Sequence, residues 1–196
     1  KWVAVGSAGF SSGTIEDASL LAVDDTLYVA YQDNVGGSRS VSVMKYDKAG
    51  TGDWVQAGDA SFPSGEDSSP ALHAADGSLY VAYRDGAHGN GITVMKDDGS
   101  GEWVAVGQPG FSPGEAFSPS VFVAEGTVYA AFMDYEFEAG FGATVMRYDE
   151  GADDWVTVGP RGFTSGNVFD TSLFIEGGTL YVAYEDSAHE AAVMKY

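Results

Sequence analysis

The chain of 196 residues contains no cysteine, only nine lysines and arginines, and no long apolar run. Without cysteine there is no disulfide and no thiolate ligand for a metal. A membrane-spanning helix needs about 20 consecutive apolar residues, so we expect no membrane insertion. The few basic residues face 29 aspartates and glutamates, which gives a net charge of −20 at pH 7. Because so acidic a surface repels phosphate backbones, we expect no nucleic-acid partner.

Catalytic and helical signatures are missing as well. No segment places apolar residues at the spacing of an amphipathic helix. No recognisable Ser-His-Asp or His-Glu-x-x-His motif is present, and the glycine-rich stretches "GSGE" and "GGSRS" are typical of turns. Paired carboxylates are plentiful, but in a chain with this many acids they arise without selection for catalysis.

The sequence repeats itself about every 50 residues. Each repeat opens on a tryptophan, in the phrases "WVAVGSAGFSSG", "WVQAGDASFPSG", "WVAVGQPGFSPG" and "WVTVGPRGFTSG". Later in each unit come "LYVAY" or a variant of it and then "VMKY", "VMKD" or "VMRY". Four units therefore span residues 2–53, 54–102, 103–154 and 155–196. A repeat of this length is typical of solenoids and propellers.

Within a unit the pattern predicts four short β-strands. In the first unit these are residues 19–23, 26–33, 41–47 and 54–58, rich in β-branched and aromatic residues. The pairs "DD", "DG", "EG" and "GG" separate the first two strands at the same place in each unit, which favours a tight hairpin. Four-stranded antiparallel sheets repeated in this way are the blades of a β-propeller. We therefore expect an all-β fold, a four-bladed β-propeller that forms a single domain over residues 1–196.

The phase of the repeat predicts how the ring closes. The chain begins on residues that match a fourth strand, Trp2–Gly6, and ends after a third strand at Tyr196. We expect Trp2–Gly6 to pair with residues 193–196, which completes the last blade and removes an exposed edge. This predicts a monomer. Two chains that exchange these strands would instead form an eight-bladed dimer.

The repeated phrases resemble the tandem-repeat β-propellers of large secreted bacterial proteins, often described as kelch-like or galactose-oxidase-like. The resemblance covers the whole chain, and the blade count is similar to that of the hemopexin-type propeller. It implies an extracellular protein that uses its propeller for binding, but it implies no particular ligand. Hemopexin-like propellers hold ions in the central channel, so the resemblance also implies a possible cation site.

Residues repeated in every unit are expected to be structural first. The four tryptophans and the phenylalanines that follow them would pack blade against blade. An aspartate ends the second strand of every unit, and a lysine or arginine follows each methionine of the third strand. We expect each aspartate either to form an ion pair with that basic residue or to cap a turn. The alternative is that the aspartates bind Ca²⁺, the cofactor that carboxylate oxygens favour. These candidate metal ligands are Asp33, Asp85, Asp134 and Asp186.

Function is better sought where the repeat is broken. In a propeller, the segments that precede the first strand and those that follow the second strand share one face. There the third unit carries an aromatic insertion, "DYEFEAGFG", and two units carry a histidine three residues after the repeated aspartate. The candidate ligand-binding residues on this face are Tyr135, Phe137, Phe141, Phe117, Phe169, His88 and His189.

These features predict a non-enzymatic extracellular module that recognises a glycan or a protein through this face. A second hypothesis, from another class, is a carbohydrate-active enzyme that uses paired carboxylates. A third is a purely structural, or engineered, ring with no ligand.

Overall fold

The computed structural model describes residues 1–137 and 140–196, without the side chains of Glu136 and Phe137. Over these residues the chain forms 15 strands and one short 3-10 turn, Gly86–His88. No helix in this part of the chain is long and apolar enough to cross a membrane. The prediction of an all-β fold is confirmed.

The strands form four antiparallel sheets, one for each sequence repeat. The first sheet contains β1 (Thr14–Val23), β2 (Thr26–Val35), β3 (Ser38–Asp47) and β4 (Asp53–Pro63). The second contains β5 (Ala71–Ala75), β6 (Ser78–Asp85), β7 (Gly91–Asp97) and β8 (Trp103–Ala105). The third contains β9 (Ala116–Ala124), β10 (Thr127–Phe137), β11 (Gly140–Asp149) and β12 (Asp154–Thr157). The fourth contains β13 (Val168–Glu176), β14 (Thr179–Asp186) and β15 (Ala191–Lys195).

The hairpins between the first two strands of each sheet form as the sequence predicts. In the first sheet both turn residues, Asp24 and Asp25, have positive φ angles of 46° and 63°. The same two positive angles recur at Glu125 and Gly126 and at Gly177 and Gly178. Two central residues with positive φ make a type I′ turn, whose twist matches that of the flanking strands.

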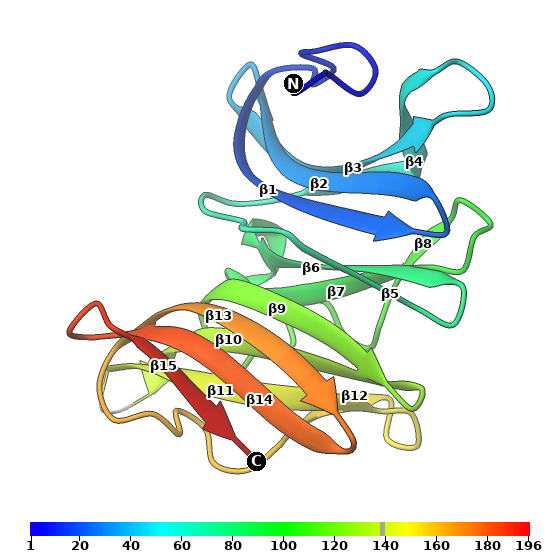
Figure 1. Ribbon diagram of the computed structural model, residues 1–196. Helices are drawn as coiled ribbons and strands as arrows, with labels where there is room; N and C mark the ends of the chain where they lie inside the picture. Colours follow the sequence, from blue (N-terminus) through cyan, green and yellow to red (C-terminus); the bar gives the residue numbers. More distant parts are fainter. Residues whose placement is uncertain (138–139) are drawn as a thin grey trace.

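The core lies between neighbouring sheets, which follow one another in chain order (Figure 1). Small β-branched and alanine side chains of one sheet pack on those of the next. For example, Val41 and Val43 of the first sheet share a buried cluster with Val81 of the second. The first strands β1, β5, β9 and β13 are neighbours in turn, and backbone N–H groups of Leu72 and Leu173 donate to serine hydroxyls on the preceding first strand.

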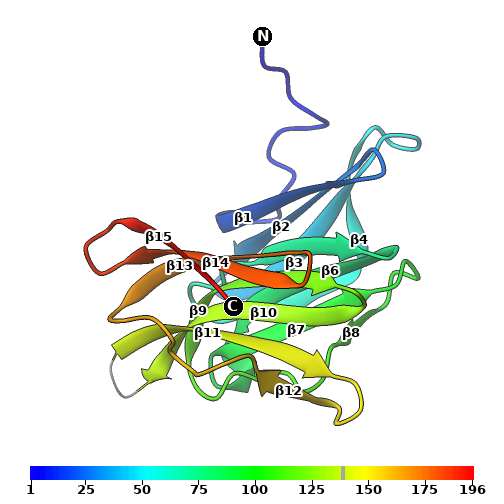
Figure 2. The same cartoon turned by 60° about the horizontal axis from the view of Figure 1, so that its bottom comes forward.

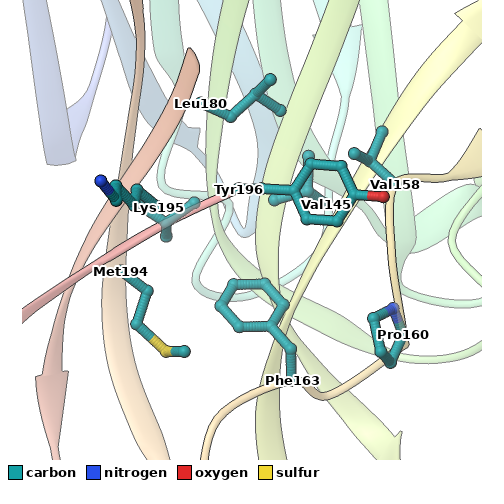
Figure 3. Close-up of a pocket in the computed structure, with 9 residues that line it drawn as sticks. Val145, Val158, Pro160, Phe163, Leu180, Met194, Lys195 and Tyr196 are labelled. Atoms are coloured by element: carbon teal, nitrogen blue, oxygen red, sulfur yellow. The ribbon is translucent and has the colours of Figure 1, made fainter.

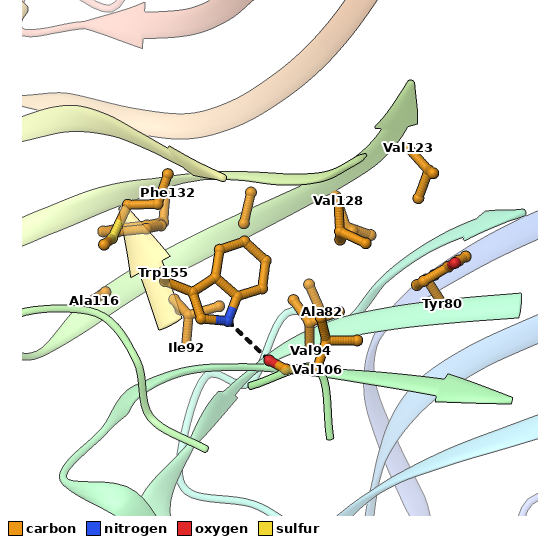
Figure 4. Close-up of a cluster of buried hydrophobic side chains, with 13 residues drawn as sticks. Tyr80, Ala82, Ile92, Val94, Val106, Ala116, Val123, Val128, Phe132 and Trp155 are labelled. Atoms are coloured by element: carbon orange, nitrogen blue, oxygen red, sulfur yellow. Dashed lines mark hydrogen bonds between the residues drawn. The ribbon is translucent and has the colours of Figure 1, made fainter. Parts of the chain in front are cut away.

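The repeated tryptophans bind one sheet to the previous one. Trp155 is 4% exposed and stacks on Phe111, with ring centroids 3.9 Å apart and an interplanar angle of 9°. Its indole N–H donates to the carbonyl oxygen of Val106, at 2.8 Å (Figure 4). Trp103 makes the corresponding bond to Ala57 of β4, so the expected packing between sheets is confirmed for Trp103 and Trp155. Trp54 donates to the oxygen of Val5 and therefore packs on the N-terminal segment, which belongs to no sheet.

The expected closure of the ring is not present. Residues 2–6 form no strand, and in the described part of the chain β15 has β14 as its sole strand neighbour. The four sheets follow an open arc, and both views place the N-terminus well away from the C-terminus (Figures 1 and 2). The rotation between successive sheets, set by the side chains packed between them, does not bring the first sheet beside the fourth.

Candidate functional site

One face of the molecule gathers the starts of the first strands of the sheets and the ends of the second strands. We call the first strands β1, β5, β9 and β13 the inner strands. The register shows this directly, because Ala116 at the start of β9 pairs with Asp134 near the end of β10. Likewise Val168 at the start of β13 pairs with Asp186 at the end of β14. We call this surface the loop face; it consists of the segments that lead into β1, β5, β9 and β13 and of the residues that end β2, β6, β10 and β14.

A non-glycine residue with a strained, positive φ angle occurs near the start of each inner strand, at the same position of every repeat. Asp17, Ser69, Ser118 and Asp170 have φ angles of 46°, 41°, 46° and 45°. Strand pairing is shifted at this point in the first, third and fourth sheets. The side chains of these residues form two hydrogen-bonded pairs. The Ser69 hydroxyl donates to Asp17 and the Ser118 hydroxyl donates to Asp170, both at 3.1 Å. Bulges and non-glycine residues with positive φ are frequent beside functional sites.

Arg84 forms the centre of an ionic cluster between the second and third sheets. The residue is 6% exposed, and its guanidinium donates to the Glu115 carboxylate and to the backbone oxygen of Glu66. The guanidinium carbon also lies 4.3 Å from the ring centroid of Phe117. An arginine held by a carboxylate, a carbonyl and an aromatic face has little rotational freedom. Glu115, whose side chain is one-third exposed, is thereby fixed at the solvent boundary.

The predicted aromatic residues lie in two groups on the loop face. Phe117, Tyr135 and Phe141 form a continuous set, with successive ring centroids 6.2 and 4.8 Å apart. Tyr135 is 48% exposed, so this set reaches solvent. Phe169 stacks on His189 at 5.7 Å on the fourth sheet. The side chain of Phe137 lies outside the described residues.

The two predicted histidines hold local positions. His88 contacts Asp85 through Nδ1, at 2.8 Å from Oδ2, and His189 contacts Glu185. Each partner lies within four residues of its histidine, so neither contact links distant parts of the fold.

The four repeated aspartates do not converge. Asp85 accepts from the Thr93 hydroxyl at 2.8 Å, and that hydroxyl accepts from the Gly110 N–H, also at 2.8 Å. Asp134 holds Thr144 in the same way and in addition forms a two-bonded ion pair with Arg161, at 2.9 Å for both bonds. In the fourth unit Asp186 caps its own turn, and in the first unit one oxygen of the buried Asp33 has no hydrogen-bond partner among the described residues.

These contacts anchor the loops that enter the next repeat. Within the described residues no group of three or more histidine, aspartate and glutamate side chains is placed to hold a metal ion. Calcium binding by the four aspartates stays a prediction.

The expected ion pairs between these aspartates and the basic residues of the third strand are wrong. Asp33 pairs with Ser40 at one end of the hairpin, whereas Lys45 pairs with Tyr28 at the other. In the second sheet Lys96 pairs with Tyr80, and its ammonium lies 5.6 Å from the tyrosine ring centroid. Antiparallel pairing brings the two strands together but separates these two positions along them.

Sequence reasoning did not single out Arg84, nor the strained backbone near the start of the inner strands. Arg84 occupies the position of the phrase "LYVAYxD" that differs in all four units, where the other units carry glutamine, methionine and glutamate. A basic residue in that position, in so acidic a chain, was the available signal.

No protein-family model matches the chain, and a search of curated proteins finds no match. Solved structures do match. The structure "Bacteroides ovatus Xyloglucan PUL GH43B" is 16% identical with a TM-score of 0.56, over 94% of this chain and 39% of that one. "Structure of RS223-Beta-xylosidase" is 14% identical with a TM-score of 0.61, and the match covers 94% of this chain and 75% of that one. "Trypanosoma rangeli sialidase in complex with sialic acid" is 17% identical with a TM-score of 0.59, and the match covers 96% of this chain and 33% of that one. The chain thus spans between one-third and three-quarters of the length of these proteins.

These likenesses establish the β-propeller fold and correct the functional expectation. The prediction of a non-enzymatic binding module is wrong, because the structural neighbours include a β-xylosidase, two arabinanases and a sialidase. No recognisable catalytic motif in the sequence pointed to an enzyme. The four repeats form a β-propeller fold, and the solved structures similar to it include glycoside hydrolases.

Proposed function

We propose that the protein is a carbohydrate-active enzyme, a glycoside hydrolase whose site lies on the loop face around Glu115. The fold it shares with a β-xylosidase, two arabinanases and a sialidase supports this reaction class. One observation carries the assignment to this site: the solvent-facing carboxylate of Glu115 is held by a nearly buried arginine. Fixing a carboxylate in one orientation prepares it to act on a bound sugar at little further entropic cost.

Most glycoside hydrolases use a pair of carboxyl groups, one on each side of the scissile bond. The best second candidate is Asp170, which the Ser118 hydroxyl orients from the neighbouring inner strand. Glu115 precedes β9 and Asp170 lies near the start of β13, and these two strands are in direct contact. The two carboxylates therefore belong to adjacent inner strands at the same face.

The aromatic set beside Glu115 provides the apolar part of the site. Sugar rings present apolar C–H faces that pack against aromatic rings. Phe117 contacts the guanidinium of Arg84 on one side and Tyr135 on the other. A sugar stacked on Tyr135 would therefore lie next to the fixed carboxylate.

The test is hydrolysis of a panel of 4-nitrophenyl glycosides of xylose, arabinose and sialic acid, followed by xylan and arabinan. We expect turnover of at least one of them. Glu115→Gln and Asp170→Asn should each lower kcat/KM by about 10²- to 10⁴-fold, the usual contribution of a carboxyl group in acid–base catalysis. Glu125→Gln, in the β9–β10 turn at the opposite face, is the matched control and should keep full activity.

Thermal melts of all three variants separate loss of chemistry from loss of fold. No turnover of any substrate by the unmodified protein would refute the enzyme assignment. Turnover that survives Glu115→Gln and Asp170→Asn unchanged would refute this site.

A further inference from the structure

An apolar pocket of about 110 Å³ lies between the third and fourth sheets (Figure 3). Its lining comes from β11, β14, β15 and the segment that follows β12. The residues include Val145, Val158, Phe163, Leu180, Met194 and Tyr196. Met194 and Tyr196 are 40% and 72% exposed, so the pocket opens at the outer edge of the fourth sheet.

The same positions in the preceding repeat surround a tryptophan. The repeat equivalents of these six residues are Val94, Val106, Phe111, Val128, Met146 and Tyr148, and all belong to the cluster that contains Trp155. Trp155 stacks on Phe111, contacts Tyr148 and donates to the oxygen of Val106. The pocket is therefore the tryptophan pocket of the fourth repeat, without a tryptophan.

The chain has one tryptophan that matches it. Trp2 is 100% exposed, whereas the other three each donate to the carbonyl three residues beyond the preceding tryptophan. The acceptors are Val5, Ala57 and Val106. The next member of this series is the carbonyl of Val158, which lines the pocket.

The segment after Trp2 already has the position that a preceding blade would give it. Ser7 donates through its N–H and its hydroxyl to Asp53, both at 2.8 Å, and Phe10 stacks on Trp54 at 4.8 Å. This repeats the packing of Phe111 on Trp155. Residues 2–4 therefore extend past the first sheet, and Figure 2 shows this end of the chain projecting from the body.

We propose that Trp2 of one copy fills the tryptophan pocket of a second copy, with residues 2–5 pairing with the outer edge of its β15. A second copy is the occupant because the N-terminal end of the chain, which carries Trp2, and the fourth sheet, which lines the pocket, lie at opposite ends of the open arc (Figures 1 and 2). The contact repeats a fourth time the geometry that already joins successive sheets. It also covers an exposed strand edge, which proteins generally avoid leaving unpaired. Reciprocal exchange between two copies joins eight sheets with both ends satisfied.

The experiment measures mass against concentration by sedimentation equilibrium, together with tryptophan fluorescence. We expect a monomer–dimer equilibrium and a blue shift of the emission on association. Trp2→Ala should weaken association at least tenfold, as is usual for a buried tryptophan at an interface. Met194→Asp should do the same by placing a charge in the pocket. Val3→Ser is the matched control, because its equivalent Val104 stays 60% exposed in β8.

Mixing the two defective variants gives a sharper test. A Trp2→Ala copy keeps an intact pocket and a Met194→Asp copy keeps an intact tryptophan, so the mixture should form a heterodimer more tightly than either variant associates alone. A protein that stays monomeric at all concentrations with Trp2 exposed would overturn the proposal. A monomer with Trp2 buried would overturn it as well, in favour of closure within one chain.

Discussion

Replacement of Trp155 by alanine tests whether the repeated tryptophans stabilise the fold from between the sheets. The indole is almost completely buried, stacked on Phe111, and bonded to the oxygen of Val106. Truncation of a buried Phe or Trp to alanine costs about 3 to 5 kcal/mol, because both burial and packing are lost. The carbonyl of Val106 also loses its partner, and an unsatisfied buried acceptor costs about 1 to 3 kcal/mol. We therefore expect a loss near the upper end, about 4 to 5 kcal/mol.

Trp2→Ala is the natural control, since it makes the same chemical change at the equivalent repeat position. Trp2 is fully exposed, and surface substitutions usually change stability by less than about 0.5 kcal/mol. In a chain of this size 1 kcal/mol corresponds to about 2 to 4 °C in melting temperature. Trp155→Ala should therefore melt roughly 8 to 20 °C lower, and Trp2→Ala within about 2 °C of the unmodified protein.

The assay is thermal and urea unfolding followed by circular dichroism, at protein concentrations low enough that single copies dominate. Equal melting temperatures for Trp155→Ala and the unmodified protein would refute the reasoning. A large loss in Trp2→Ala under the same dilute conditions would also refute it, because it would mean that Trp2 is buried within one copy.

Three further changes have defined outcomes. Burial lowers the pKa of His73 in the folded protein below its usual 6.5. The stability that comes from its neutral form is therefore complete above pH 6.5 and is lost as the pH falls through the folded pKa. His73→Phe should reduce the drop in melting temperature between pH 7.5 and pH 5. Asp134→Asn should cost about 1 to 3 kcal/mol in urea unfolding, because it breaks the charge-assisted bonds to Arg161. Gly58→Ala should cost at least about 1 to 3 kcal/mol of unfolding free energy, because Gly58 has a φ of 65° and the added methyl would lie 2.0 Å from the oxygen of Gly101. Gly52→Ala is the control for backbone strain alone, because Gly52 has a similar φ of 67° and no atom lies within 4 Å of the added methyl.

Local features of the fold were predictable because their causes are local. The pairs "DD", "EG" and "GG" tolerate two successive positive φ angles, so they predict the I′ hairpins that the structure contains. The β-branched and aromatic residues of "TLYVAYQD" predict strand β2, but its alternation does not predict burial, because Ala30–Asp33 are all buried. Both signals act within a few residues. The observed strand β1 begins at Thr14, five residues before its predicted start, because pairing with β2 continues past the bulge at Asp17.

Relations between repeats were less predictable because they depend on three-dimensional packing. Period-two alternation says which face a residue points to but not which residue pairs opposite it. The expected partners Asp33 and Lys45 consequently lie at opposite ends of one hairpin. Ring closure depends on the rotation between sheets, which is set by the volumes of side chains such as Val43 and Val81 between them. No single repeat contains that information.

The candidate site shows how one repeated position can serve either structure or function. Gln32 occupies the variable position of the first unit, is fully buried, and bonds with Gly65 and Ser68 at the entry of the next repeat. Arg84 occupies the same position in the second unit, and its guanidinium bonds the carboxylate of Glu115 in the equivalent entry segment of the third unit. The backbone framework is the same in both units, so the difference lies in the side chain alone. Because the repeat holds the framework in place, a single longer, charged side chain can fix a carboxylate at the loop face without any change in the strands that carry it.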